Sequence, residues 1–358
     1  MNLEEYNQER NNQTGKNCHK FSPCVAPFNN MYFAVRGQCS PCWLSSGFLD
    51  KWSKKKSVRD IWFGEKFRQY RDNLRNNVFE DQCKLCKSDI DNGIWPLALA
   101  YDKFSIDIEY PTVMELELSN QCNLECLMCS GILSSGIRKN REKLPPLEHL
   151  YDDTFVEQLN EFIPYLEELR FNGGEPLLQN IVHKICKNVV KINPNLRINI
   201  ATNGTVYNKK VQSLLDNNNI WFNISMDGFT KETYEKIRIN ANYETLIRNF
   251  KIFLEYSETH NKNISIMVNP MRNNWWEMHL AVEFCEMYHT NLWYNTIRYP
   301  EHLSLWNLNK TTLQAIYDNM KIKLLSMDKS SNTYSKYEHL VEKQIKTWIT
   351  CTEQNIKT

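Results

Sequence analysis

Short β-rich runs alternate with helical stretches through the middle of the chain. The first run, residues 113–118, alternates apolar residues with Glu115 and Glu117, as expected for a strand. Further β-rich runs follow at residues 168–171, 197–201, 221–225, 264–268 and 292–297. Between them, apolar residues recur at three- and four-residue spacing, which predicts helices at residues 154–161, 178–192, 209–216, 231–238, 243–256 and 277–288.

This alternation predicts an α/β fold with a parallel sheet. Right-handed crossovers place the carboxyl ends of all six strands on one rim, so the pattern indicates a partial (β/α)6 barrel of the TIM type. Six strands rather than eight leave a side opening for a large substrate. Active sites of barrel folds lie at the carboxyl ends of the strands, so the loops that follow the strands are the candidate site.

The segments on either side of the barrel have a different pattern. Helices are expected at residues 57–64 and 67–76 in a cysteine-rich N-terminal segment, and residues 98–110 form a linker into the first barrel strand. Two polar helical stretches, residues 311–326 and 334–350, follow the last strand. These changes predict three parts, namely an N-terminal module at residues 1–97, a barrel at 98–300 and a C-terminal helical extension at 301–358.

Three cysteines follow the first predicted strand on one short loop. Cys122, Cys126 and Cys129 are separated by three and then by two residues. Thiolates select iron-sulfur clusters, zinc or copper(I), and three thiolates on one loop can hold three corners of a cubane cluster. The fourth iron would then have no protein ligand, which leaves a place for a cofactor.

This spacing resembles the signature of the radical S-adenosylmethionine (SAM) enzymes, and the resemblance extends to Gly173-Gly174-Glu175-Pro176 after the second strand. The resemblance implies a catalytic [4Fe-4S] cluster on the three cysteines and reductive cleavage of SAM to a 5′-deoxyadenosyl radical. It also implies that Gly173 and Gly174 bring backbone close to the methionine part of SAM and that Glu175 binds its amino group. A zinc knuckle or three buried thiols is the alternative.

Four further residues match positions that contact SAM in the family. Met128 stands where relatives often carry an aromatic residue, and it keeps the adenine environment apolar. Asn203 is expected beside SAM, although Asn-Gly is also a common turn pair. Ser225 ends the fourth strand, where relatives contact the carboxylate or ribose of SAM, whereas the nearby Asp227 could cap the next helix. Asn269 ends the fifth strand and is expected to reach the ribose, or to form an Asn-Pro turn.

The two glutamates of the first strand share one face. If the apolar residues between them pack outward on helices, Glu115 and Glu117 point into the barrel. Buried carboxylates need partners. A cation such as Arg298, just after the last strand, could form a structural ion pair with them, or they could contact the substrate.

The N-terminal segment contains a second cysteine pattern. Cys24 is followed by twelve residues, then Gly37, four residues and Cys42, and a Cys83-x-x-Cys86 pair comes later. This resembles the SPASM auxiliary-cluster module in its shorter twitch form, because no cysteine follows directly after the pair. The resemblance implies an auxiliary [4Fe-4S] cluster on the four cysteines, without an open iron and suited to electron transfer. The module usually follows the barrel, whereas here it precedes it.

A zinc ribbon is the competing interpretation of this module. It would use two Cys-x-x-Cys pairs, the first of which begins with Cys39. Forty residues separate these pairs, compared with about 15–20 in such ribbons, and the ribbon leaves Cys24 without a role. In the cluster interpretation Cys18 and Cys39 are ordinary thiols, and ligation by either stays open.

Composition narrows the class of protein. The chain has 358 residues, 42% of them hydrophobic, and a formal net charge of +1, which gives no general attraction to nucleic acid or to anionic membranes. No apolar run approaches the roughly 20 residues of a membrane span, and the polar N-terminus has no signal-peptide pattern, so we expect a cytoplasmic protein. Twelve cysteines without an export signal favour metal or cluster binding over disulfides.

Together these features predict a radical SAM enzyme that abstracts hydrogen from a substrate and oxidises or cross-links a peptide or protein. The resemblance implies SAM, a catalytic and an auxiliary [4Fe-4S] cluster, and an electron donor such as flavodoxin or ferredoxin. Modification of a small alcohol or amino sugar is the alternative reaction. A metal-stabilised binding protein, with zinc or an iron-sulfur cluster, is the alternative without catalysis.

Overall fold

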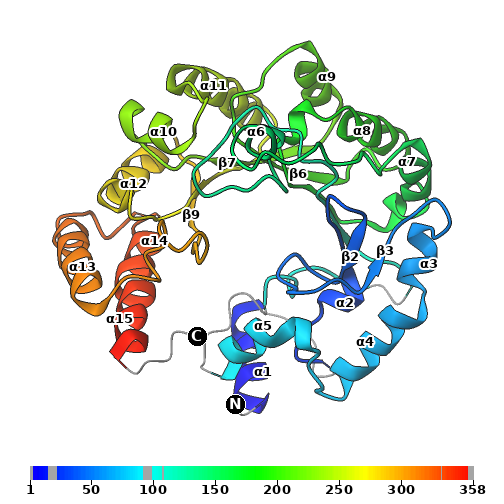
Figure 1. Ribbon diagram of the computed structural model, residues 1–358, viewed down its shortest axis with the longest axis horizontal. Helices are drawn as coiled ribbons and strands as arrows, with labels where there is room; N and C mark the ends of the chain where they lie inside the picture. Colours follow the sequence, from blue (N-terminus) through cyan, green and yellow to red (C-terminus); the bar gives the residue numbers. More distant parts are fainter. Residues whose placement is uncertain (1–2, 15–21, 92–98, 107–108, 332, 354–358) are drawn as a thin grey trace. The chain divides into compact units, whose positions relative to one another are not determined.

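The computed structural model describes residues 3–14, 22–91, 99–106, 109–331 and 333–353. The chain divides into two compact units, both of which contain strands and helices (Figure 1). The first unit comprises residues 1–121, 146–200 and 209–220. The second comprises residues 122–145, 201–208 and 221–358.

The first unit is built on a sheet to which the N-terminal segment contributes three strands. β1 pairs in parallel with β4, β4 with β5, and β5 with β6, while β2 and β3 extend the edge beside β1 in antiparallel fashion. The strand order in this unit is therefore β3-β2-β1-β4-β5-β6. These strands are β1 (Asn30–Phe33), β2 (Gln38–Ser40), β3 (Asp50–Lys51), β4 (Val113–Leu116), β5 (Glu168–Phe171) and β6 (Arg197–Thr202).

Helices of the first unit pack in succession, α4 on α3, α3 on α7, α7 on α8 and α8 on α9 (Figure 1). Aromatic rings fill the core near β1: Trp52 stacks on Tyr151 with ring centroids 5.5 Å apart, and Phe33 meets Phe155 edge-on at 5.3 Å. The helices of this unit are α1 (Leu3–Thr14), α2 (Ala26–Asn29), α3 (Val58–Trp62), α4 (Glu65–Arg75), α5 (Lys84–Asp91), α7 (Asp153–Leu159), α8 (Asn180–Ile192) and α9 (Lys209–Asn217), with short 3-10 turns at Asp81–Cys83, Ile163–Tyr165 and Pro176–Leu178.

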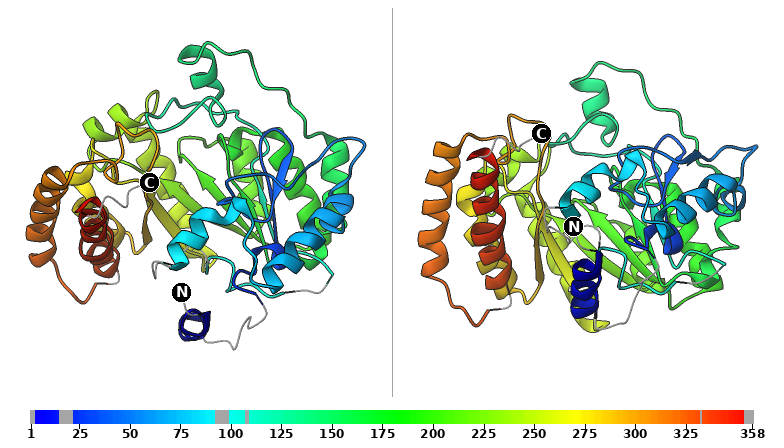
Figure 2. Two further views of the ribbon diagram at one scale, coloured as in Figure 1. Left: turned by 60° about the horizontal axis from the view of Figure 1, so that its bottom comes forward. Right: turned by 90° about the horizontal axis from the view of Figure 1, so that it is seen from below.

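The second unit contains three parallel strands, in the order β7-β8-β9, with Phe222 of β7 stacked on Phe253 of α11. Helices α13 and α14 pack against α12, and α13 and α15 lie side by side (Figure 2). The elements are α6 (Ser135–Asn140), β7 (Ile220–Ser225), α10 (Lys231–Ile237), α11 (Tyr243–Thr259), β8 (Ile264–Val268), α12 (Met278–Met287), β9 (Asn291–Tyr294), α13 (Lys310–Leu325), α14 (Tyr334–Glu338) and α15 (Lys346–Glu353), with a 3-10 turn at Trp275–Glu277 and a π-helix at His339–Ile345.

The expected mixed α/β fold with parallel strands is confirmed, and the six barrel strands predicted from the sequence correspond to β4 to β9. The three-part division into residues 1–97, 98–300 and 301–358 stays a prediction. Strands β1, β2 and β3 were not predicted, because none of them shows a sustained alternation of apolar and polar residues. Among the described residues, no helix is both long enough and apolar enough to span a bilayer.

The predicted linker is packed rather than extended over the surface. Tyr101, Asp102 and Phe104 are buried, and the side chain of Asn29 donates a hydrogen bond to the Tyr101 carbonyl at 3.1 Å. The described residues of this stretch form no helix or strand and lead into β4, as expected of a linker, but tertiary contacts bury part of it.

The glutamates of β4 have partners within the first unit. Glu115 accepts hydrogen bonds from the Tyr101 hydroxyl at 2.9 Å and from Arg170 of β5 at 2.6 Å, so its cation is Arg170 and not Arg298. Glu117 follows β4, and its amide donates to the Phe33 carbonyl at 2.8 Å. Burial raises the pKa of Glu117 to about 7, although a hydrogen bond with Tyr32 opposes this rise.

The raised pKa of Glu117 predicts a pH dependence of stability. The folded state holds this proton more tightly than the unfolded state, so the contribution is fully present below the unfolded pKa near 4.5 and is lost as pH rises through about 7. Relative to Glu117→Gln, the unfolding free energy of the wild type should fall by about 2 kcal/mol between pH 5.5 and 7.5, as measured by anaerobic urea titration. Glu65→Gln, at an exposed site on α4, is the matched control. Parallel plots of unfolding free energy against pH for the wild type and Glu117→Gln would contradict the assignment.

Candidate functional site

The three-cysteine loop belongs to the second unit and is held by its backbone. The amide of Glu125 donates to the Ile239 carbonyl at 3.0 Å, and the amide of Leu127 donates to the Ile237 carbonyl at 2.9 Å. These two bonds join the loop to the end of α10 in the manner of a short strand pair. The hydroxyl of Ser134, which also caps α6, donates to the Leu124 carbonyl at 2.7 Å. The loop is therefore fixed on both sides of its second cysteine.

The thiols of this loop fit an iron-sulfur cluster. Cys122, Cys126 and Cys129 are all partly exposed. Burial, together with the charges of Cys126 and Cys122, raises the pKa of Cys129 to about 12. A thiol whose pKa is raised in this way becomes a thiolate only when a cationic group binds it, and iron supplies that charge.

One cation beside this loop, Arg238, was not predicted from the sequence. Arg238, at the end of α10, is buried, and its Nη1 lies 3.9 Å from the sulfur of Cys126. Burial raises the pKa of Cys126, and the charge of Arg238 opposes that rise. The guanidinium also forms a 2.6 Å ion pair with Asp227. Sequence gives no signal for this role, because a cation in the last turn of a helix is common for reasons of the helix dipole alone.

Asp227 organises the loop after β7 instead of capping the next helix. Thr230 provides the cap of α10, so the capping interpretation of Asp227 was wrong. The Oδ1 atom of Asp227 accepts hydrogen bonds from the backbone and the side chain of Asn269, at 2.8 and 2.9 Å. The side chain of Asn274 donates to the Asp227 carbonyl at 2.8 Å. Thus Asn269 is brought to the same network that contacts Cys126 through Arg238.

The Gly-Gly-Glu-Pro segment lies in the first unit, where its backbone passes close to Glu117 and Gln121. Gly173 has a φ of +90°, and a Cβ there would lie 2.5 Å from the Cγ of Glu117. A Cβ on Gly174 would lie 2.4 Å from the Gln121 carbonyl oxygen. Only glycine fits at both positions, because the first needs a left-handed backbone and the second has no room for a side chain.

Glu175 and Pro176 begin the 3-10 turn after these glycines. Glu175 is fully buried, its amide donates to the Gln121 carbonyl at 2.7 Å, and its carboxylate accepts from the Leu177 amide at 3.1 Å. The carboxylate thus already has a structural task in capping this turn, in addition to the expected task of binding an amino group. Any test of Glu175 has to separate the two.

The other expected SAM contacts lie in the second unit. Asn203 makes an Asx turn with Thr205 at 2.9 Å and donates to Asn123 of the cysteine loop at 3.0 Å. The turn is therefore formed, and the contact of Asn203 with SAM stays a prediction. Ser225 is the last residue of β7 and is half-buried. Met128 packs with Ile237 and other apolar side chains in a small hydrophobic cluster.

Four thiols also gather in the N-terminal part of the first unit. Burial raises the pKa of Cys42 well above its usual value, and Cys24, Cys83 and Cys86 add to the rise. The pKa of Cys24 is raised in the same way, by burial and by the charges of Cys83 and Cys86. The hydroxyl of Tyr70 lies 2.8 Å from the sulfur of Cys83. The four side chains therefore fit the ligands of a second cluster.

Gly37 of the same motif has a φ of +81° in the turn between β1 and β2, which explains its place between the cysteines. Cys39 lies apart from the four thiols. It is fully buried in β2, and its pKa is raised by burial and by Asp50 rather than by other cysteines. This placement does not favour the zinc ribbon, which would need Cys39 as a ligand. Cys18 lies outside the described residues.

No three His, Cys, Asp or Glu side chains in the described part of the chain surround a single metal ion. The sulfurs of one zinc site would lie about 3.8 Å apart, since each is about 2.3 Å from the metal in a tetrahedron. In a cubane each thiolate binds a different iron, so the sulfurs lie farther apart.

Comparison with known families gives two matches. Residues 116–285 match the radical SAM superfamily, and residues 24–87 match SPASM, an iron-sulfur cluster-binding domain. These families use SAM, a catalytic [4Fe-4S] cluster and auxiliary iron-sulfur clusters, which are the expected cofactors.

Curated relatives include the GTP 3',8-cyclase of Synechocystis sp., 28% identical over 44% of this chain and 46% of that protein. A probable GTP 3',8-cyclase of Methanocaldococcus jannaschii is 25% identical over 51% of this chain and 57% of that protein. The chain spans about half the length of the curated relatives it matches.

Solved structures with a similar chain path include anSMEcpe with bound AdoMet, with a TM-score of 0.43 and 19% identity over 60% of this chain and 61% of that one. Streptococcus suis SuiB bound to precursor peptide SuiA gives a TM-score of 0.46 and 13% identity over 70% of this chain and 60% of that one.

The cysteine loop, the Gly-Gly-Glu-Pro segment and the two family matches lead to one conclusion. This chain belongs to the radical SAM superfamily and carries its SPASM domain before the radical SAM domain.

Proposed function

We propose that this protein uses SAM to abstract a hydrogen atom from a peptide or protein and to convert it to an oxidised or cross-linked product. The observation that carries the proposal is the combination of two thiol sets, one of three cysteines and one of four. A cluster on three thiolates keeps an open iron for SAM, whereas a cluster on four has none and is suited to accept an electron.

When bound, the catalytic cluster and SAM supply the reductive cleavage that generates the 5′-deoxyadenosyl radical. Cys122, Cys126 and Cys129 would hold the irons, and Arg238 offsets part of the negative charge that three thiolates bring into a half-buried loop. Neutralising this charge stabilises the reduced state, which carries one more electron. Asp227 keeps the guanidinium in place.

The remaining residues bind and orient SAM. Glu175 offers a carboxylate to the amino group, while Gly173 and Gly174 let the backbone approach the methionine part. Met128 provides an apolar contact for adenine, and Ser225, Asn203 and Asn269 offer hydrogen bonds to the carboxylate and ribose. Holding the reacting carbon close and excluding water is the main task of the protein, because the radical attacks any accessible C–H bond.

The SPASM domain favours an oxidation. A substrate radical must lose an electron to become a closed-shell product, and Cys24, Cys42, Cys83 and Cys86 would hold the acceptor. Electrons for SAM cleavage would come from a flavodoxin or ferredoxin. A small-molecule substrate is the second candidate, and it is supported by the match to GTP 3',8-cyclases.

Iron content and SAM cleavage test this proposal. After anaerobic reconstitution the wild type should hold about eight irons, and the Cys122/Cys126/Cys129 triple alanine variant and the Cys83→Ala/Cys86→Ala variant about four each, since each [4Fe-4S] cluster holds four. With dithionite and SAM, the wild type and the Cys83/Cys86 variant should form 5′-deoxyadenosine, and the triple variant none.

Cys186→Ala, at a buried cysteine of α8 far from both motifs in sequence, is the matched control and should retain all the iron. Four irons in the wild type with one equivalent of zinc would exclude the auxiliary cluster. S-adenosylhomocysteine as the main product would exclude radical cleavage.

A second prediction concerns Glu175. Glu175→Gln keeps an oxygen that can accept from the Leu177 amide but removes the negative charge. Loss of a charge-assisted contact of about 1.5–3 kcal/mol should weaken SAM binding about tenfold to a hundredfold, as measured by equilibrium dialysis with the oxidised, cluster-loaded protein. Glu232→Gln, at an exposed site on α10, is the control. Wild-type affinity in Glu175→Gln would limit Glu175 to its structural role.

A further inference from the structure

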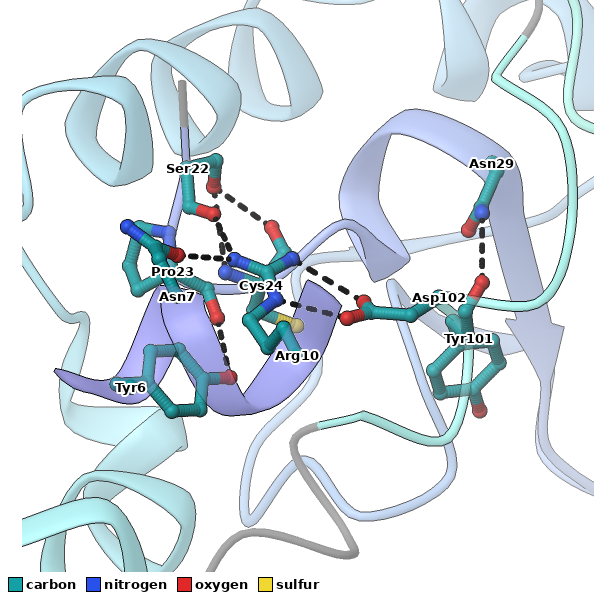
Figure 3. A network of polar contacts seen from close by, with 9 residues as sticks. All are labelled: Tyr6, Asn7, Arg10, Ser22, Pro23, Cys24, Asn29, Tyr101 and Asp102. Carbon is teal, nitrogen blue, oxygen red and sulfur yellow. Dashed lines mark hydrogen bonds and ion pairs between the residues drawn. The ribbon is translucent and has the colours of Figure 1, made fainter. Parts of the chain in front are cut away.

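Helix α1 lies outside the residues that match the SPASM domain, yet it contacts the segment that carries the first auxiliary cysteine. The side chains of Tyr6 and Arg10 on this helix point toward that segment (Figure 3). Both are fully buried. Arginine is almost never buried completely unless it is paired and its donors are satisfied. The position of Arg10 therefore needs a specific explanation.

Two hydrogen bonds from α1 hold the backbone just before Cys24. Arg10 Nη1 donates to the Ser22 carbonyl at 2.7 Å, and the Tyr6 hydroxyl donates to the Pro23 carbonyl at 2.7 Å (Figure 3). The Ser22 hydroxyl in turn donates to the Cys24 carbonyl at 2.7 Å and accepts from the Cys24 amide at 3.3 Å. The peptide groups on both sides of the Cys24 Cα are thus fixed by a chain of contacts that begins on α1.

The other edge of the Arg10 guanidinium binds a turn that is attached to the sheet. Arg10 Nε and Nη2 bind the two carboxylate oxygens of Asp102 at 2.7 and 3.2 Å, and both side chains are 0% exposed. Tyr101, next to Asp102, accepts at its carbonyl from Asn29 and donates its hydroxyl to Glu115 of β4. Arg10 therefore bridges the Cys24 segment to a turn that is attached to β4.

Asp102 keeps the buried guanidinium of Arg10 charged. Burial alone would lower the pKa of Arg10, but the hydrogen bond and charge of Asp102 outweigh this effect. A buried ion pair is rarely more stabilising than apolar side chains of the same volume, because desolvation offsets the attraction. What Arg10 supplies and an apolar residue cannot is the bond to the Ser22 carbonyl.

We propose that α1 is part of the auxiliary iron-sulfur site and that Arg10 is a positioning residue, which clamps the Ser22–Cys24 segment so that the Cys24 sulfur stays directed at the other three thiols. Tyr6 is the second contact of this clamp. The inference rests on the proposed cluster at Cys24, Cys42, Cys83 and Cys86. Releasing the clamp would free one of four ligands and would let solvent and chelators reach the cluster.

The test uses the full chain with Cys122, Cys126 and Cys129 replaced by alanine, so that only the auxiliary cluster remains. Iron release to a ferrous chelator is followed anaerobically after reconstitution. Arg10→Gln should release iron about 10- to 100-fold faster than this parent, the usual effect of losing an outer contact of a metal ligand. Tyr6→Phe should cause a smaller acceleration. Arg68→Gln, an exposed arginine on α4, should release iron at the parent rate.

A double variant separates the clamp from simple fold stabilisation. Arg10→Met with Asp102→Leu removes both charges and keeps apolar volume, so it leaves no buried charge unpaired. If Arg10 positions Cys24, this variant still releases iron quickly, because Ser22 has lost its donor. Parent-like release by the double variant, or by Arg10→Gln, would overturn the proposal.

Failure of the underlying cluster assignment would look different. In the same background, Cys83→Ala with Cys86→Ala should hold little iron. If that variant retained as much iron as the parent, the four-cysteine ligand set itself would be wrong, whatever the behaviour of Arg10. If it lost iron while Arg10→Gln behaved as the parent, only the clamp would be excluded.

Discussion

The parallel pairing of β1 with β4 is the constraint on which the first unit depends. It places four residues of the SPASM domain in register with the strand that begins the radical SAM domain, from Asn30 beside Val113 to Phe33 beside Leu116. A parallel pair needs a long crossover, and here about eighty residues lie between the two strands. They contain Cys42, Cys83 and Cys86, while Cys24 precedes β1. The auxiliary site is therefore built on the same sheet as the Gly-Gly-Glu-Pro segment, and its position is set by backbone hydrogen bonds rather than by a flexible linker.

Several arginines in the described part of this chain form ion pairs with buried carboxylates. Arg10 pairs with Asp102 and Arg170 with Glu115 in the first unit, and Arg238 pairs with Asp227 in the second. Such pairs contribute little net stability, but each guanidinium has more donors than its carboxylate uses. Arg10 uses one for the Ser22 carbonyl, and Arg238 directs one at the Cys126 sulfur. The pairs of Arg10 and Arg238 thus hold donors in place beside the segments that carry Cys24 and Cys126.

The two thiol sets differ in the number of ligands, as the proposed function requires. Three thiolates leave an iron open, so the first set is suited to bind SAM and start the reaction, while four thiolates close the cluster and limit it to electron transfer. In each set, burial and neighbouring thiols raise the pKa of at least one member, Cys42 in the auxiliary set and Cys129 in the loop, and such thiols become ligands only together with iron. Cluster assembly and local folding should thus be coupled at both sites.

The sequence by itself determined the cysteine loop, the glycines at Gly173 and Gly174, the six parallel strands and the second cysteine motif, because each is a local signal of spacing or periodicity. Only the tertiary structure decided that Cys39 lies apart from the four gathered thiols, that Glu115 pairs with Arg170, and that Arg238 lies beside Cys126. It also decided that Arg10, 14 residues before Cys24 in the sequence, holds its segment. Periodicity tells which side chains are buried, but a buried charge takes its partner from whichever strand or helix the fold brings next to it, and that choice is made by long-range pairing.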